Sequence, residues 1–263
     1  MGIVNVTPDS FADKTSTLDP RAAVDAALAM AAAGADLIDV GGESTQPGAQ
    51  PVSADEELAR VVPVIRAIAA RVNLPISVDT RKAVVARAAV DAGAAIVNDI
   101  SGLRDDAALA RTAAESGAAL VLMHMRGQPA DMYAKAVYDD VVADVTRELG
   151  ESIRLARDGG LPVERVIVDP GIGFAKRPLH SYGVLARLPE IVAAIDRPVL
   201  VGPSRKSFLS EASGGRPAIE RDWGTAAAVT AAVLAGAHIV RVHAVAEMAQ
   251  VVRVAEEIRR HQP

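Results

Sequence analysis

Polar side chains stand where three short apolar runs end. Asp79, Asn98 and Asp169 each follow directly on a run of Ile and Val residues. A polar side chain at the end of a buried strand is costly unless it has a partner or a task. Carboxylate and amide groups suit a flat heterocycle that carries N–H donors and carbonyl acceptors. The three residues are therefore candidates for binding such a ring, although any one alone could cap a loop.

Basic residues gather at the ends of two further runs. Arg205 and Lys206 come soon after Val199–Val201, and Arg241 and His243 end the next run along the chain. Arginine binds oxygens in pairs and lysine supplies a compact charge, a combination that suits phosphate or pyrophosphate. The sequence thus predicts a local cationic patch in a chain whose formal net charge is −5.

Asn5 ends the first apolar run. Its amide oxygen could be one neutral ligand of Mg²⁺, with phosphate oxygens and water supplying the other ligands. A heterocycle edge beside a pyrophosphate group suggests a displacement at a carbon that bears a pyrophosphate leaving group.

Eight short apolar runs alternate with helical patterns. Several runs follow a glycine that ends an Ala-rich stretch, as in Ala33-Gly34-Ala35 and Ala92-Gly93-Ala94, where a helix stop favours positive φ. Runs that are apolar on both faces are typical of strands buried in a parallel sheet. The expected strands are Ile3–Val6, Leu37–Val40, Ile76–Val78, Ile96–Asn98, Leu120–Met123, Val166–Val168, Val199–Val201 and Ile239–Val242.

Helix signals fill the intervals between the runs. Asp19-Pro20 is a cap followed by proline, and Ser53 with Glu56 forms a capping box. The remaining helices are expected near 82–92, 106–115, 140–157, 180–194, 225–234 and 246–260. Parallel strands need helical crossovers, so we expect one (β/α)8 TIM barrel, a single domain over residues 1–263. A doubly wound open sheet is the alternative. In the barrel, the candidate residues would meet at the carboxyl ends of the strands.

Composition excludes several classes of protein. Half of the residues are apolar and 23% are charged, which rules out a disordered chain. Without cysteine there is no disulfide framework and no thiolate nucleophile. The acidic balance disfavours nucleic acid as a partner, and no apolar run is long enough to span a membrane. No secretion signal is visible, so we expect a cytoplasmic protein.

Two strings carry a specific resemblance, MGIVNVTPDSF at 1–11 and DVGGEST at 39–45. They resemble the two signatures of the dihydropteroate synthase family. Further strings agree in order along nearly the whole chain: SVDT at 77–80, NDI at 98–100, MHM at 123–125, DPGIGFAK at 169–176, SRKS at 204–207 and RVH at 241–243.

The resemblance implies a barrel enzyme of folate biosynthesis. Such an enzyme condenses 6-hydroxymethyl-7,8-dihydropterin pyrophosphate with 4-aminobenzoate, with Mg²⁺, and releases 7,8-dihydropteroate and pyrophosphate. The implied mechanism is a dissociative displacement that needs no protein nucleophile. The family also implies a homodimer, which the Ala-rich helices near 225–234 and 246–260 could support.

The resemblance also assigns roles by position. Asp79, Asn98, Asp169 and Lys206 would hold the pterin, with Met123 packing nearby and Arg241 stacking on its face. The pyrophosphate and its metal would be bound by Asn5, Thr45, Arg241 and His243. The aminobenzoate would be framed by Phe174, Lys206 and Ser207, with Phe11 and Pro47 from two loops. Asp79, Asp169, Lys206, Arg241 and His243 are the expected catalytic group.

Three departures from the family pattern affect substrate affinity and sulfonamide sensitivity. Lys14-Thr15 replaces Gly-Gly after Asp13, Gln46 replaces an arginine before Pro47, and Ala244 replaces an aspartate after His243. Two alternatives stay open. One is a pterin-binding methyltransferase that uses methyltetrahydrofolate, and the other is a paralogue that binds pterin without turnover.

Overall fold

The structure is a computed structural model, and it describes residues 1–7, 20–46 and 48–262. Several residues named above as site residues or as departures from the family pattern lie outside the described residues: Phe11, Asp13, Lys14, Thr15 and Pro47.

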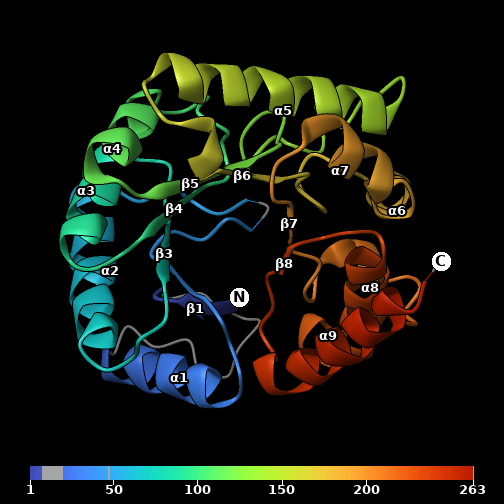
Figure 1. Cartoon of the computed structure of the whole chain (residues 1–263), viewed down its shortest axis with the longest axis horizontal. Helices are drawn as coiled ribbons and strands as arrows, with labels where there is room; N and C mark the ends of the chain where they lie inside the picture. Colours follow the sequence, from blue (N-terminus) through green and yellow to red (C-terminus); the bar gives the residue numbers. More distant parts are fainter. Residues whose placement is uncertain (8–19, 47, 263) are drawn as a thin grey trace.

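Parallel strands form a closed ring at the centre of the molecule (Figure 1). β1 to β6 make one sheet in sequential order, and β7 pairs with β8. Isolated bridges Val168↔Val199 and Gly2↔Val242 join the two sheets and close the ring. The strands of the described chain are β1 (Gly2–Asn5), β2 (Ile38–Gly41), β3 (Ile76–Asp79), β4 (Ile96–Asp99), β5 (Ala119–Met123), β6 (Val166–Asp169), β7 (Leu200–Val201) and β8 (Ile239–Val240). The closed ring confirms the barrel and excludes the open sheet.

Helices surround the ring on its outside (Figure 1). Within the described residues they are α1 (Pro20–Ala32), α2 (Ala54–Ala69), α3 (Ala83–Asp91), α4 (Ala108–Ser116), α5 (Val141–Asp158), α6 (Pro178–Ala186), α7 (Leu188–Ile195), α8 (Asp222–Leu234) and α9 (Val245–Arg260). The one helix expected over 180–194 was wrong, because two helices meet there at Arg187. Pro189 in the first turn of α7 has no N–H to continue the ladder of α6.

Local signals in the sequence explain where the helices begin and end. The Ser53 hydroxyl accepts a hydrogen bond from the Glu56 N–H at 3.2 Å, which caps α2. Asp140 caps α5 by accepting from the N–H groups of Val142 and Ala143. Gly117 ends α4 at φ +78°, a conformation that costs glycine little.

The described core consists of one large layer and two smaller clusters. The main part lies between the outer faces of the strands and the inner faces of the helices, and residues such as Ile38, Val78 and Leu120 are fully buried there. A smaller cluster of Met1, Ile96, Val121 and Leu200 packs together separately from this layer.

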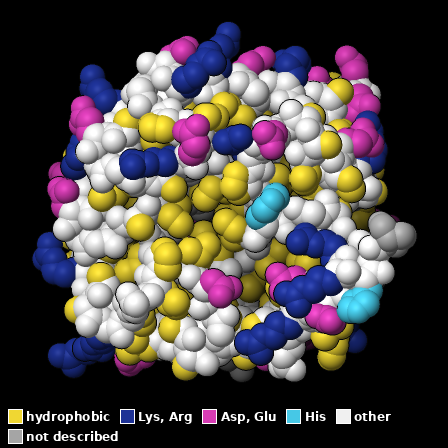
Figure 2. Space-filling model, in the orientation of Figure 1, with side chains coloured by type: hydrophobic (Ala, Val, Ile, Leu, Met, Phe, Trp, Pro, Cys, Tyr) yellow, Lys and Arg dark blue, Asp and Glu magenta, His cyan; other side chains and the backbone are white. Residues whose placement is uncertain are grey.

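Figure 2 shows one face of the molecule, with charged side chains of both signs around its edge and apolar side chains lining a hollow at its centre. Within the described residues, the structure has no helix with the length and apolar character that crossing a membrane requires.

Candidate active site

Strand register brings the polar strand ends to one rim. Asn5 lies opposite Gly41, Gly41 opposite Asp79, and Asp79 opposite Asn98. A Cβ atom on Gly41 would lie 3.4 Å from the Cβ atom of Asp79 and 3.9 Å from Asn5 Oδ1. Glycine at this position therefore leaves open the space between the two polar side chains.

Arg241 follows β8 and reaches across the ring to two carboxylates. Its Nε donates to Asp39 Oδ2 at 2.7 Å, and its Nη2 donates to Asp79 Oδ2 at 3.0 Å. Residues separated by 202 positions in the sequence thus meet because the ring closes between β8 and β1. The guanidinium group is held in place before any ligand arrives.

Asp39 on β2 is a site residue to which the sequence analysis gave no role. It is fully buried, and its Oδ2 also accepts from Asn98 Nδ2 at 3.3 Å. Its Oδ1 is buried without a hydrogen-bond partner among the described residues. A charged residue inside an apolar strand was the available signal, because burying a carboxylate is costly unless it is paired.

Burial raises the pKa of Asp79 and Asp169. For Asp79, the guanidinium of Arg241 opposes this rise, while the carboxylate of Asp39 adds to it. For Asp169, at the end of β6, the opposing groups are Lys206, the Gly171 N–H at 2.7 Å, Lys176 and Arg241. The pKa of Asp79 is raised to about 7, whereas for Asp169 the four opposing groups act against the rise that burial causes.

Lys206 follows β7 and lies beside the turn that follows β6. Its Nζ donates to the carbonyl oxygen of Ile172 and stands 4.3 Å from the centre of the Phe174 ring. Burial lowers the pKa of Lys206 to about 8, while Asp169 and Asp79 act in the opposite direction. The amine thus stays mostly charged at neutral pH, close to both carboxylates.

The predicted cationic patch is smaller than the sequence suggested. Arg205 forms an ion pair with Asp222 of α8 at 2.8 Å. His243 shares a hydrogen bond with the Ser204 hydroxyl at 2.9 Å through its Nδ1. Burial and the neighbouring Arg205 lower the pKa of His243 to about 3, so its imidazole is neutral at physiological pH. Lys206 and Arg241 are the predicted members that remain as charges facing the carboxylates.

Apolar side chains flank the polar group on one side. Met123 at the end of β5 is buried in a cluster with Ile100, Met125, Met132 and Ala175, against which Phe174 packs. Asn98 faces the site, whereas its neighbour Asp99 turns away and caps the following loop through Ser101 and Leu103. The cluster provides an apolar surface for the face of a flat ring.

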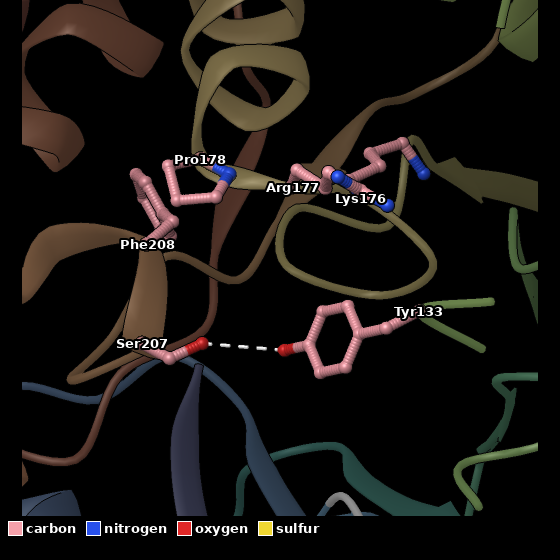
Figure 3. Close-up of a pocket in the computed structure, with 6 residues that line it drawn as sticks. All are labelled: Tyr133, Lys176, Arg177, Pro178, Ser207 and Phe208. Atoms are coloured by element: carbon pink, nitrogen blue, oxygen red, sulfur yellow. Dashed lines mark hydrogen bonds between the residues drawn. The ribbon is translucent and has the colours of Figure 1, made fainter. Parts of the chain in front are cut away.

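A cavity of about 390 Å³ adjoins Ser207, at the outer end of this region. Tyr133 and Ser207 both line it, and Figure 3 shows their hydroxyl groups pointing toward each other. The two oxygens are 3.3 Å apart and share a hydrogen bond. Ser207 itself is exposed. Tyr133, from the loop between β5 and α5, had no role in the sequence analysis.

Ion pairs fasten the base of the loop that carries Thr45. Glu43 receives hydrogen bonds from both Arg81 and Lys82, which follow β3. Lys82 also contacts the buried Glu57 of α2 at 2.5 Å. The half-buried Thr45 comes two residues after this anchor, near the rim of the site.

Comparisons with known proteins agree with this geometry. A family model described as pterin binding enzyme matches residues 1–243. The dihydropteroate synthase of Synechocystis sp. is 44% identical over 260 residues, which cover 99% of this chain and 90% of that protein.

Two solved enzymes share the fold closely. Dihydropteroate synthase from Yersinia pestis, in complex with a sulfonamide drug, has a TM-score of 0.95 and 42% identity, covering 99% of this chain and 94% of that one. The Xanthomonas albilineans enzyme with 4-aminobenzoic acid has a TM-score of 0.91 and 43% identity, covering 100% and 93%. In another structure that enzyme holds 7,8-dihydropteroate.

Identity above 40% along almost the whole chain, together with the shared barrel, leaves no ambiguity of family. The chain belongs to the dihydropteroate synthases of folate biosynthesis, within the family of pterin-binding enzymes.

Proposed function

We propose that this chain condenses 6-hydroxymethyl-7,8-dihydropterin pyrophosphate with 4-aminobenzoate to give 7,8-dihydropteroate and pyrophosphate. The observation that carries the proposal is the buried group of Asp79, Asn98 and Asp169 beside the charges of Lys206 and Arg241. Hydrogen-bond donors and acceptors, and charges of both signs, lie together there at the carboxyl ends of the strands. Barrel enzymes have their active sites at this end.

The pterin ring suits this group chemically. An aminopyrimidinone edge presents neighbouring N–H donors, and the carboxylates of Asp79 and Asp169 accept such bonds when ionised. The amide of Asn98 offers one donor and one acceptor, and the Lys206 amine donates to a ring carbonyl or nitrogen. Met123 supplies an apolar contact for the ring, and Arg241 supplies a planar group that stacks on its face.

Mg²⁺ fits the site as a partner of the pyrophosphate. In the described part of the chain no three or more His, Asp or Glu side chains are arranged to hold a metal ion. Asn5 nevertheless ends β1 at the rim, and Mg²⁺ commonly takes few protein ligands beside phosphate oxygens and water. The bound ion would neutralise charge on the departing pyrophosphate, while Thr45, Arg241 and His243 would bind its oxygens.

The aminobenzoate would lie between Phe174, Lys206 and Ser207. Phe11 and Pro47, to which the family resemblance gives the same substrate, lie outside the described residues. The Phe174 ring offers a stacking surface, and the amine above it offers a charge for the carboxylate. The Ser207 hydroxyl lies at the outer end, beside the cavity of Figure 3.

The reaction would be a dissociative displacement. The bond between the methylene carbon and the pyrophosphate oxygen breaks, and its electron pair leaves with the pyrophosphate. The lone pair of the aniline nitrogen then forms the new C–N bond, and the nitrogen releases a proton to solvent. The chain's own residues fix the two reactants and stabilise the separating charges, so no covalent intermediate with the protein is needed.

One assay tests the proposal against both alternatives. Purified protein is incubated with the pterin pyrophosphate, 4-aminobenzoate and Mg²⁺, and dihydropteroate is measured. We expect product from these components alone. Product that requires methyltetrahydrofolate and a corrinoid partner would favour the methyltransferase, and pterin binding without product would favour the non-catalytic paralogue. A Lys206→Ala variant should bind both reactants more weakly.

The altered loop residues predict an altered aminobenzoate pocket. Gln46 lacks the positive charge that the family usually places before Pro47, a charge able to reach the pyrophosphate or the benzoate. Inhibition by sulfonamides, measured together with the KM for 4-aminobenzoate, tests this expectation for the chain and for a Gln46→Arg variant. Equal values in the two proteins would show that the substitution is neutral.

A homodimer is the proposed assembly. Trp223 at the start of α8 is 89% exposed, and Val254 and Ile258 on α9 are also exposed. Exposed apolar side chains on neighbouring helices are typical of an interface. Light scattering after size exclusion measures the mass, and Trp223→Ser should shift it towards the monomer. A monomer in the unaltered protein would contradict the proposal.

A further inference from the structure

Lys176 is a buried lysine in the turn between β6 and α6. Its side chain is only 1% exposed, whereas lysines are almost never buried unless they are paired. Its Nζ makes two hydrogen bonds, to the Phe174 carbonyl oxygen at 3.2 Å and to His124 Nδ1 at 2.8 Å. No step of the proposed reaction uses this amine, so its burial calls for another explanation.

A series of hydrogen bonds connects Lys176 through His124 to Glu148 of α5. His124 Nε2 lies 3.0 Å from Glu148 Oε2, and Arg126 binds the same carboxylate. Burial and the charge of Lys176 lower the pKa of His124 to about 3, so the imidazole is neutral. Its Nδ1 then accepts from the lysine and its Nε2–H donates to Glu148, which fixes the tautomer. Lys176 is thereby held from the side of α5.

The turn that Lys176 fastens carries three contacts of the site. Gly171 N–H donates to Asp169 Oδ1, the Ile172 carbonyl accepts from Lys206, and the Phe174 ring lies beneath that amine. A second donor reaches the turn from the same side, because the Tyr138 hydroxyl donates to the Ala175 carbonyl at 2.8 Å.

The backbone of this turn is strained and needs such support. Gly171 and Gly173 have φ values of +69° and +79°. Ala175 has φ +48°, in the left-handed region that residues with a Cβ atom rarely occupy. Conformations of this kind persist only where the surroundings determine them.

Lys176 also acts on Asp169 through its charge. The amine lowers the pKa of that carboxyl group from behind the site, together with Lys206, Arg241 and the Gly171 N–H. In the other direction, burial lowers the pKa of Lys176 to about 7, with Lys206 and Arg126 acting in the same sense and Asp169 and Glu148 opposing it. A Cβ atom on Gly171 would lie 3.4 Å from Lys176 Nζ, and the N–H of the same glycine binds Asp169. Of the two lysines that interact with this carboxyl group, only Lys206 is assigned to the substrates.

We propose that Lys176 is a positioning residue of the synthase reaction, which holds the Phe174 turn in place and sets its amine beside Gly171, the residue whose N–H binds Asp169. The inference rests on the proposed function, because the turn and the carboxylate belong to its two substrate subsites. Lys176 lines the cavity of Figure 3 but has no place in the substrate assignments above, and we expect it to act through Phe174 and Asp169.

Two substitutions separate the hydrogen bonds of Lys176 from its charge. Lys176→Met keeps the unbranched side chain and removes both. Lys176→Gln removes the charge but keeps a donor for the Phe174 carbonyl. Lys135→Met is the matched control, because it makes the same change at an exposed lysine in the β5–α5 loop. Melting temperature, kcat and both KM values are measured for each protein from pH 5 to pH 9.

The unaltered chain should form dihydropteroate, which tests the proposed function by itself, and the Lys135→Met control should match its activity. For Lys176→Met we expect kcat/KM to fall about 10- to 100-fold for both substrates. The acidic limb of kcat/KM for the pterin should move to higher pH by about one unit, because Asp169 loses a neighbouring cation. Lys176→Gln should recover part of the loss for aminobenzoate and keep the shifted acidic limb.

Other outcomes overturn the inference while the synthase assignment stands. Unchanged KM values and an unchanged acidic limb, with only the melting temperature lowered, would show a purely structural lysine. Failure of both variants to fold would lead to the same conclusion. If the unaltered chain makes no product at all, the proposed function fails instead.

Discussion

Arg241 and Asn98 both donate hydrogen bonds to the carboxyl group of Asp39. Its Oδ2 accepts from both side chains, so one oxygen sets the position of two groups assigned to the pterin. A neutral residue of the same shape would leave the packing intact but weaken the hold on Arg241.

Asp39→Asn should therefore lower kcat/KM for the pterin pyrophosphate about 100-fold, since small displacements of positioned groups are costly to catalysis. The chain should still fold, because Asp79 continues to pair with Arg241. Steady-state kinetics measure the loss, and circular dichroism with thermal melting controls for folding. Kinetics within about twofold of the unaltered chain would contradict this role.

Tyr133 acts at the other end of the site, where its hydroxyl meets that of Ser207 (Figure 3). Tyr133→Phe should raise the KM for 4-aminobenzoate about two- to tenfold, which corresponds to one hydrogen bond. The KM for the pterin pyrophosphate should not change, because Tyr133 lies beside Ser207 and not beside the carboxylates. Equal effects on the two KM values would assign Tyr133 a general structural role.

At the scale of elements, the strands and most helices follow from local pattern. Ile38, Val78 and Leu120 are buried on strands whose apolar runs are visible in the sequence, and Ser53 caps the helix that its capping box predicted. The division at Arg187 into α6 and α7 was not predicted, because a proline in a first turn is compatible both with a new helix and with a kinked one.

The turn after β6 is the element on which the site depends most. A Cβ atom on Gly173 would stand 2.9 Å from Lys206 Cδ, and φ there is +79°. Gly173→Ala should cost about 1–2 kcal/mol of stability from the left-handed backbone, and it should also displace Lys206 and raise both KM values.

Gly215→Ala is the control for that prediction. Gly215 has φ +73°, but a Cβ atom there would meet nothing within 4 Å. It should show a similar loss of stability in chemical denaturation with unaltered KM values. Kinetic constants that change equally in both variants would refute the contact with Lys206 as the cause.

At the scale of the whole molecule, buried amines make stability depend on pH. The pKa of Lys176 is about 7 in the folded chain, below its ordinary value of 10.5. Between these values the unfolded chain binds the proton and the folded chain does not, so the free energy of unfolding rises with pH. Lys206 acts in the same sense from about pH 8.

Denaturant unfolding at pH 7 and pH 10 measures this effect. We expect the unaltered chain to gain a few kcal/mol over the interval, at about 1.4 kcal/mol for each unit of pKa difference. Lys176→Met should gain less, because the contribution of Lys176 is lost while those of Lys206 and the Met1 amino group remain. A variant with the same pH slope as the unaltered chain would mean that Lys176 is charged throughout.

Local sequence pattern was enough to predict the barrel, with an open sheet as the alternative, and to predict the rim at which the polar residues meet. Alternating apolar runs and helix signals are local, and parallel strands with helical crossovers have few ways to pack. Asp79, Asn98 and Asp169 could be named as site residues because each ends a strand.

Tertiary packing sets which charged groups face the site and whether each group is protonated. It pairs Arg205 with Asp222 outside the carboxylate group, leaves His243 neutral, and joins Arg241 to Asp39. It also buries Lys176 against His124. These ion pairs and protonation states depend on burial and on the neighbouring charged groups. Burial and neighbours in turn depend on residues that are far apart along the chain and meet only when the ring closes.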